Sequence, residues 1–261
     1  MKAFPLPSAR VRALLVAGLI GLLPVLSGML VLRWQVTRTF EFQAQHVAGE
    51  AVRQLDSMID QAAQSAQRLM PLAGKPCNAA VIQAILQEVT IEPYVRSANL
   101  VRNHDAYCSS FYGAYKRAVE PGEYFNRHLL LRASNPVTPN EASLVYRLYE
   151  HPRGVRTVID GRTLAEALRL IQGDTVLIMQ VGNAFLWGDS SIQDGEIPDH
   201  QAHHTSQVSE RHGYRVHSGF SPEKAWELWR IQGLSTLGGL LLLGVLTGGV
   251  CHWLLRRQQR P

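Results

Sequence analysis

Two long apolar stretches lie near the ends of the chain and enclose a mainly polar middle. Residues 13–32 contain no charged side chain, and in residues 233–255 the only ionisable groups are Cys251 and His252. About 20 consecutive apolar residues are enough for a helix to cross the hydrocarbon core of a bilayer. The pattern therefore predicts two transmembrane helices. No small-residue cleavage site follows the first stretch, so an uncleaved anchor is favoured over a signal peptide.

Positive charges next to these stretches predict their orientation. Residues 1–12 and 256–261 carry six Lys and Arg between them, whereas the inner flanks, 33–44 and 219–230, carry four. Cytoplasmic flanks of transmembrane helices are enriched in Lys and Arg, so both tails are expected in the cytoplasm. Residues 33–232 are then expected in the periplasm. This topology is that of a two-pass protein of a bacterial inner membrane.

The net charge of +5 belongs mainly to the tails. Of the 26 Lys and Arg, 20 lie in residues 33–232, together with all 21 acidic residues. The central segment is therefore almost neutral. Binding to the phosphate backbone needs a cationic surface on the folded domain, so no nucleic-acid partner is expected.

A helical pattern opens the central segment. Apolar or small residues recur with a four–three spacing from Ala51 to Leu69 and predict one face of a long helix. Such a face fits a signalling or dimerisation helix, and it equally fits a helix that lies on the sheet of its own domain. The run "LAGKPC" at residues 72–77 should end this helix. Asn78 is expected to cap a short helix over residues 79–89.

Extended runs around turn-forming residues predict an antiparallel sheet. The turn "RNHD" separates the runs 95–101 and 106–111, which are expected to form a hairpin. Thr163 is expected to cap a helix over residues 163–172. Further strands are expected over residues 127–134, 144–150, 155–159, 174–182 and 213–220. Helices followed by strands in hairpin order indicate one α+β domain with a long N-terminal helix, which resembles PAS/Cache-like extracytoplasmic sensor domains.

Two of the three cysteines fall in the expected periplasmic segment. Cys251 lies in the second apolar stretch and is interpreted as a small apolar residue. Cys77 and Cys108 lie outside, in a compartment that favours disulfides. A bridge between them would be either a permanent structural bond or a switchable pair. A domain of this size can bury enough surface without a bridge, which favours switching. The spacing differs from Cys-x-x-Cys, so a thioredoxin-like oxidoreductase is not expected.

The run Cys108-Ser109-Ser110 follows a strand–turn–strand pattern and one upstream cysteine, Cys77. In these features the chain resembles the CSS-motif periplasmic domain of membrane-bound cyclic diguanylate (cyclic di-GMP) phosphodiesterases. In that family a span, the CSS domain and a second span precede a cytoplasmic EAL catalytic domain. The resemblance implies that Cys77 and Cys108 are a redox pair, closed by periplasmic disulfide-forming machinery, and that the dithiol form permits phosphodiesterase activity.

The sequence departs from the family because it ends six residues after the second apolar stretch. An EAL phosphodiesterase domain is therefore expected downstream in a longer protein or on a separate partner. The tripeptide Glu166-Ala167-Leu168 is attributed to chance, because it lies on a short amphipathic helix of the expected periplasmic segment. No catalytic residue and no cofactor is expected on this chain. A metal site is not expected either, because the run with Asp199, His200, His203 and His204 resembles a solvated loop more than a metal-binding helix.

Gly244 and Gly248 form a Gly-x-x-x-Gly pattern in the second apolar stretch. This pattern lets two helices approach closely and is consistent with a homodimer through the transmembrane helices.

The leading hypothesis is an inner-membrane sensory module that regulates cyclic di-GMP phosphodiesterase output through a reversible Cys77–Cys108 disulfide. The alternative is a membrane-anchored, small-molecule-binding sensor with a purely structural disulfide.

Overall fold

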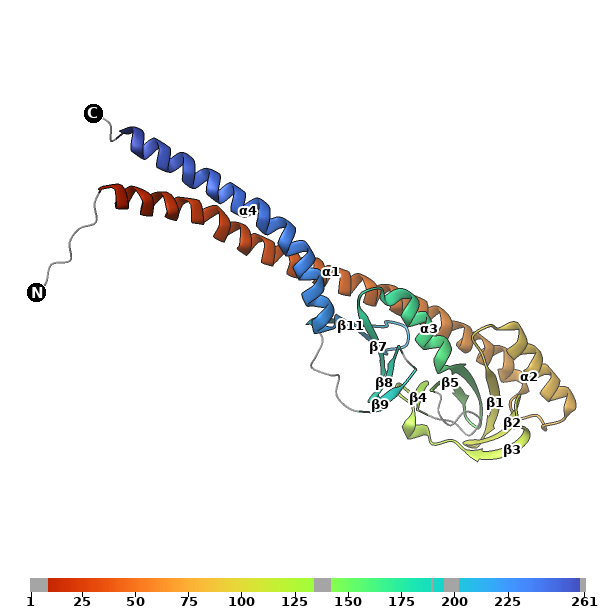
Figure 1. Cartoon of the computed structure of the whole chain (residues 1–261). Coiled ribbons are helices and arrows are strands. Elements are labelled where there is room, and N and C mark those ends of the chain that lie inside the picture. The colour runs from red at the N-terminus through yellow and green to blue at the C-terminus, as the bar shows by residue number, and fades with distance from the viewer. Residues whose placement is uncertain (1–8, 134–141, 189, 195–201, 259–261) are drawn as a thin grey trace, which may run out of the picture. The chain divides into compact units, whose positions relative to one another are not determined.

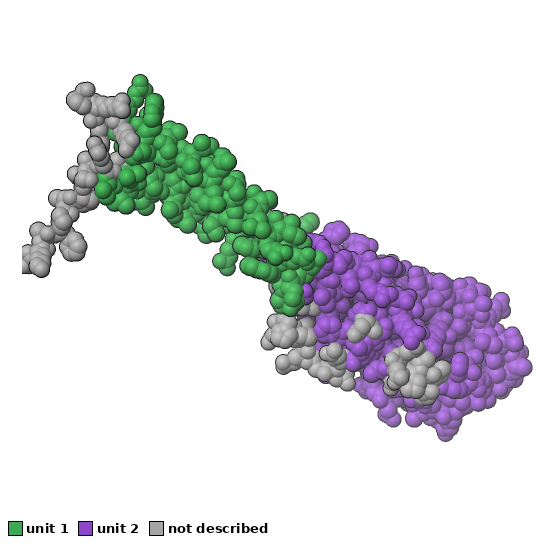
Figure 2. All heavy atoms as spheres, in the orientation of Figure 1, with its two compact units in different colours: residues 1–42, 222–261 green, residues 43–221 purple. Residues whose placement is uncertain are grey.

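The chain forms two compact units in the computed structural model (Figure 1). Unit 1 comprises Met1–Phe42 and Pro222–Pro261, and unit 2 comprises Gln43–Ser221 (Figure 2). The structure describes residues 9–133, 142–188, 190–194 and 202–258. Parts of the expected tails, residues 1–8 and 259–261, and residue 134 of one expected strand therefore lie outside the described residues.

Unit 1 is built from helical segments. They are the N-terminal part of α1 (Ala9–Leu69) and the whole of α4 (Pro222–Gln258). Both helices are long and apolar enough to cross a membrane, and large side chains on both remain exposed, such as Leu30 at 71 % and Val245 at 74 %. Exposed apolar side chains are expected where a helix faces lipid.

Glycines allow close packing inside unit 1. A Cβ atom placed on Gly244 would lie 2.8 Å from the carbonyl oxygen of Gly21, and one placed on Gly248 would lie 3.2 Å from that of Ala17. The Gly-x-x-x-Gly face of α4 therefore contacts α1 of the same chain. A homodimer through this face stays a prediction.

Unit 2 contains two antiparallel sheets, which confirms the α+β class with antiparallel pairing. The first sheet has the strand order β3-β2-β1-β6-β5-β4. Its strands are β1 (Ser97–Arg102), β2 (Asp105–Ser109), β3 (Gly113–Ala118), β4 (Leu129–Arg132), β5 (Ser143–Glu150) and β6 (Arg153–Asp160). The second sheet has the order β10-β11-β7-β8-β9. Its strands are β7 (Val176–Val181), β8 (Ala184–Trp187), β9 (Ile192–Asp194), β10 (Ala202–Val208) and β11 (Arg215–Phe220).

The second half of α1 supplies the core of unit 2. The predicted stripe from Ala51 to Leu69 is buried, and none of its apolar members is more than 3 % exposed. Leu55 and Met58 share one hydrophobic cluster with residues of both sheets, and the Thr157 hydroxyl donates a hydrogen bond of 2.9 Å to the Ala62 carbonyl. The structure therefore agrees with the second reading of this face, a helix that lies on its own domain.

The described part of the domain also contains the shorter helices α2 (Ala79–Ile91) and α3 (Gly161–Gln172) and the 3-10 turns η1 (Met70–Leu72) and η2 (Pro121–Glu123). The predicted cap of α2 is confirmed, because the Asn78 side chain accepts from the Val81 amide at 3.0 Å.

The predicted cap of α3 is wrong. The helix begins two residues before Thr163, and the Asp160 carboxylate caps it by accepting from the Arg162 amide at 2.9 Å. Asp160 ends β6, and Gly161 lies so close to Ala142 that a Cβ atom there would be 2.3 Å from the alanine side chain. The tight turn at this glycine brings the carboxylate to the helix start before Thr163 is reached.

Candidate functional site

A disulfide joins Cys77 to Cys108, with the two Cα atoms 5.4 Å apart. Cys108 lies on β2 and is fully buried, whereas Cys77 lies in the loop before α2 and is half-buried. The sulfur atoms belong to a hydrophobic cluster formed by the end of α1, by α2 and by the adjacent face of the first sheet. Cys77 is therefore the more solvent-accessible residue of the pair.

Non-covalent contacts hold the same loop against the β1–β2 hairpin. The Gly74 amide donates to the Tyr107 hydroxyl at 2.8 Å, and the Arg102 guanidinium donates to the Gly74 carbonyl. The Arg102 guanidinium also lies 5.0 Å from the centre of the Tyr107 ring. None of these contacts involves sulfur.

The two serines of the motif shape the turn after β2. The Ser109 hydroxyl accepts from the Phe111 amide at 3.1 Å. The Ser110 hydroxyl accepts from the Ala98 amide at 3.1 Å, and its own amide donates to the Ala98 carbonyl at 2.9 Å. A short hydroxyl side chain at each position can satisfy backbone donors in the turn. The motif thus combines the bridging sulfur with the two groups that fix the following turn.

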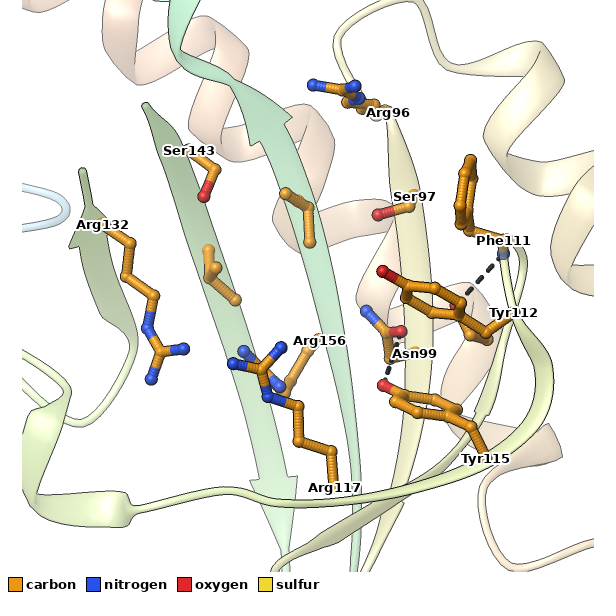
Figure 3. Close-up of a pocket in the computed structure, with 13 residues that line it drawn as sticks. Arg96, Ser97, Asn99, Phe111, Tyr112, Tyr115, Arg117, Arg132, Ser143 and Arg156 are labelled. Carbon is orange, nitrogen blue, oxygen red and sulfur yellow. Dashed lines mark hydrogen bonds between the residues drawn. The ribbon is translucent and has the colours of Figure 1, made fainter. Parts of the chain in front are cut away.

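Strand alternation directs Cys108 and Ser109 to opposite faces of the sheet. On the Ser109 face lies a cavity of about 100 Å³. It is lined by the arginines Arg96, Arg117, Arg132 and Arg156 and by aromatic residues of the turn after β2 and of β3. Figure 3 shows the guanidinium groups of Arg117 and Arg156 in the space between Arg132 and Tyr115.

Among the described residues, the polar groups that line the cavity are neutral hydrogen-bonding groups or cations. The Tyr115 hydroxyl donates to the Asn99 side-chain oxygen at 2.9 Å. Burial raises the pKa of Tyr115 above the ordinary tyrosine value, and burial likewise raises the pKa of the neighbouring Tyr124. Both phenols therefore keep their protons at neutral pH. Among the described residues that line the cavity none is acidic.

The other residues singled out in the sequence lie away from the disulfide. His203 and His204 are on β10, and the His204 ring lies 3.1 Å from that of His217, between Nε2 and Nδ1, while Asp199 and His200 lie outside the described residues. No group of three or more metal-binding side chains occurs in the described part of the chain. Cys251 is a free cysteine on α4.

Glu166 is exposed on α3.

The arginine-lined cavity was not predicted from the sequence. Of its four arginines, Arg96, Arg132 and Arg156 lie inside predicted strands, where an arginine ordinarily indicates a solvated face and does not signal a cavity.

Comparisons with known proteins identify the domain. Two solved structures show the same fold at low sequence identity. The extracellular ligand binding receptor from Desulfohalobium retbaense is 8 % identical with a TM-score of 0.51, over 69 % of this chain and 40 % of that one. The ligand binding domain of the Pseudomonas aeruginosa amino acid chemoreceptor PctB, in complex with L-Gln, is 13 % identical with a TM-score of 0.52, over 76 % of this chain and 97 % of that one.

No curated protein matches the chain in sequence. The family model described as the CSS motif domain associated with EAL matches residues 41–233. That match covers the disulfide, both serines and the whole of unit 2. The chain belongs to the CSS-motif domain family.

Proposed function

We propose that the chain is a redox-responsive sensory module that controls a cyclic di-GMP phosphodiesterase through a reversible Cys77–Cys108 disulfide. The observation that carries the proposal is the bridge itself, in which a half-buried sulfur is bonded to a buried one within a CSS motif. The association of the family with EAL domains supports a phosphodiesterase as the output. The EAL domain would be downstream in the same protein or on a separate partner.

The redox step is an ordinary thiol–disulfide exchange. In oxidation, the Cys77 and Cys108 thiols lose two protons and two electrons to a disulfide of the periplasmic disulfide-forming machinery, which becomes a dithiol. In reduction, a thiolate of an external dithiol attacks the Cys77 sulfur, the more accessible one, and Cys108 leaves as the thiolate. The second thiol of the donor then releases Cys77. Bridge and donor thus exchange two electrons and two protons.

Opening the bridge acts on the region where two helices meet. Cys77 directly precedes the Asn78 cap of α2, and the Cys108 cluster includes Ala66 and Leu69 at the end of α1. Removal of the covalent bond relaxes the spacing between the start of α2 and strand β2. A change in this cluster can shift the packing of α1, the helix that continues in sequence into the first apolar stretch.

The proposal includes the topology predicted from the sequence. Spans at residues 13–32 and 233–255 would anchor the chain in the inner membrane, with residues 33–232 in the periplasm and both tails in the cytoplasm. Two apolar helices and the fold of an extracytoplasmic sensor domain support this arrangement.

Thiol labelling in intact cells tests reversibility. The full chain carrying Cys251→Ser is expressed, quenched in acid and treated with maleimide-PEG. We expect no label in cells with active disulfide-forming machinery, and two labels after that machinery is removed or a reductant is added. Cys77→Ser in the same background is the matched control and should always carry one label. A bridge that stays closed under every one of these conditions would leave only a structural bond.

A second candidate function is a small-molecule sensor with a permanent disulfide. The cavity on the Ser109 face favours it, and so does the shared fold with a domain whose structure holds L-Gln. It predicts that Cys77→Ser with Cys108→Ser lowers stability without changing phosphodiesterase output, whereas a ligand raises the melting temperature.

A further inference from the structure

Two buried arginines lie directly opposite each other on neighbouring strands. Arg147 of β5 pairs with Arg156 of β6 in the antiparallel register, and the two are 5 % and 8 % exposed. Their side chains are on the face of the first sheet that carries the cavity, since Val145 and Val158 at alternating positions also line it. Like charges that face each other across a strand pair destabilise a sheet.

No carboxylate among the described residues neutralises this pair. The Nε atoms of Arg147 and Arg156 are both buried without a hydrogen-bond partner. Aromatic rings lie against both guanidinium groups. The Arg147 guanidinium lies 5.3 Å from the centre of the Tyr124 ring and 4.4 Å from that of Tyr149, and the Arg156 guanidinium lies 6.0 Å from that of Tyr124.

Burial without a counter-ion is costly for a permanent cation. The effect is visible at Arg147, where burial lowers the pKa of the guanidinium below its ordinary value. Replacing either arginine by an apolar residue would remove this cost. Arg156 lines the cavity and Arg147 does not, so an anion that enters the cavity would supply the missing counter-ion to Arg156.

The cavity in front of Arg156 is positively charged because not all of its lining arginines have a carboxylate partner among the described residues. Arg132 pairs with Glu123, and Arg96 pairs with Asp160. Arg117 on β3 has no carboxylate partner among the described residues; it is exposed to solvent and lines the same cavity as Arg156 (Figure 3). Two guanidinium groups without a carboxylate partner among the described residues thus border a space of about 100 Å³.

We infer that this cavity binds a small organic anion through a carboxylate held by Arg117 and Arg156. A planar guanidinium presents paired donors that match the two oxygens of a carboxylate. Asn99 and the Tyr115 phenol add polar groups, while Phe111 and Tyr112, 63 % and 48 % exposed, provide apolar surface at the rim for the body of the ligand.

The volume of the cavity limits the size of the part of the ligand that it can enclose. A cavity of about 150 Å³ holds benzene, so about 100 Å³ holds roughly four to six non-hydrogen atoms, the size of a carboxylate with a short carbon chain. The charge of the cavity lining limits the chemical class of the ligand. Because no acidic residue lines the cavity among the described residues, the ammonium group of an amino acid finds no counter-ion there. A mono- or dicarboxylate is therefore preferred over a zwitterion.

The site is independent of the redox proposal, although Ser109 borders it one residue from Cys108. The test uses the full chain in detergent micelles and calorimetric titration with acetate, malonate, succinate and benzoate. Inorganic phosphate and sulfate, L-glutamine and glycerol form the comparison panel. We expect at least one carboxylate to bind more tightly than any member of that panel.

Matched variants locate the site. Arg117→Ala should weaken carboxylate binding about tenfold or more, the effect typical of losing a hydrogen bond to a charged group. The control is Lys116→Ala, which removes one positive charge from the next residue of β3. Lys116 is exposed, pairs with Asp105 at 3.3 Å and does not line the cavity, so this variant should bind as the wild type does.

Arg156→Lys keeps the positive charge but removes the paired donors of the guanidinium. It should also weaken binding, with an unchanged circular dichroism spectrum. Arg117 lies on an exposed edge strand, so its variant remains informative even where Arg156→Lys does not fold. Failure of all four carboxylates to bind, tighter binding of L-glutamine or an inorganic anion, or equal affinities of Arg117→Ala and Lys116→Ala would overturn the inference. A Cys77→Ser, Cys108→Ser protein that still binds carboxylate separates this result from the fate of the redox proposal.

Discussion

Removing the Cys77–Cys108 bridge should cost a large share of the stability of unit 2 without unfolding it. The bond closes a loop with a sequence separation of 31 residues. On the chain-entropy model, a loop of this length corresponds to about 4 kcal/mol of unfolding free energy at 25 °C. Typical domains have about 5–15 kcal/mol in total. The reduced domain is therefore expected to be folded but markedly easier to unfold.

Contacts around the bond explain why the reduced domain stays folded. The hydrogen bond from Gly74 to Tyr107 and the contact of Arg102 with Gly74 do not involve sulfur. Val81 and Ile85 of α2 remain buried against the same cluster. These groups leave the loop attached while the covalent constraint is gone, which is the condition for a bridge that can close again.

Urea unfolding of the full chain in micelles, followed by circular dichroism, measures the effect. The Cys77→Ser, Cys108→Ser double variant should unfold with a free energy about 4 kcal/mol below that of Cys251→Ser, the control that keeps the bridge. A reductant should lower the stability of the control and leave the double variant unchanged. A difference below about 1 kcal/mol, or equal sensitivity to reductant, would refute the reasoning.

Three further changes test other parts of the domain. Asn78→Ala should lower the unfolding free energy by about 1 kcal/mol, measured by urea titration, because the Val81 amide loses its acceptor. Tyr214→Phe should cost about 1.5–3 kcal/mol in the same assay, because the buried hydroxyl donates to the Asp56 carboxylate at 2.8 Å. Burial lowers the pKa of His217 to about 4, so stability should be complete above about pH 6.5 and should fall, by up to about 3 kcal/mol, as the pH drops from there to 4.

The sign of the pH effect follows from proton binding. Between pH 6.5 and 4 the unfolded chain protonates this histidine and the folded domain does not, so acid favours unfolding. In the folded domain Nε2 of His217 lies 2.7 Å from the Gln180 side-chain oxygen and Nδ1 faces the His204 ring, which suits a neutral imidazole. His217→Gln should make the melting temperature less dependent on pH between 6.5 and 4. An unchanged slope would contradict the assignment.

The other two changes also have clear contradicting outcomes. Asn78→Ser keeps a capping acceptor and should be close to the wild type, so equal losses for Ser and Ala would argue against the cap. For Tyr214→Phe, a cost below about 0.5 kcal/mol would mean that the Asp56 carboxylate is satisfied by the Ser209 hydroxyl alone, which donates to it at 2.7 Å.

Elements with a strong hydrophobic period could be predicted from the sequence. The α1 face from Ala51 to Leu69, the hairpin around "RNHD" and the central strands β5, β6, β7 and β11 were all recognised, because burial of one or both faces requires apolar residues at fixed spacing. The apolar edge strand β4 was also recognised, whereas the polar edge strands β3 and β10 were not. Strand β3 is largely exposed and β10 is the polar run "AHHTSQV", so their pairing depends on neighbours distant in sequence.

The candidate site could be predicted only in part. Cys77 and Cys108 stand out by residue type and compartment, and the structure joins them. The arginines did not stand out, since an arginine in a strand ordinarily marks a solvated face. β5 and β6 form a local hairpin, but the burial of the arginines also depends on Tyr124, which is distant in sequence and lies against both guanidinium groups.

A pulse of membrane-impermeant reductant, with cyclic di-GMP measured in the same cells, addresses the redox mechanism most directly. In cells whose EAL phosphodiesterase is controlled by this chain, the wild type should show a fall in the cyclic di-GMP pool that reverses after the reductant is washed out. The Cys77→Ser, Cys108→Ser protein should hold the pool low and show no response. Identical responses in both strains, or a constant pool in the wild type while its thiols become labelled, would contradict control by this bond.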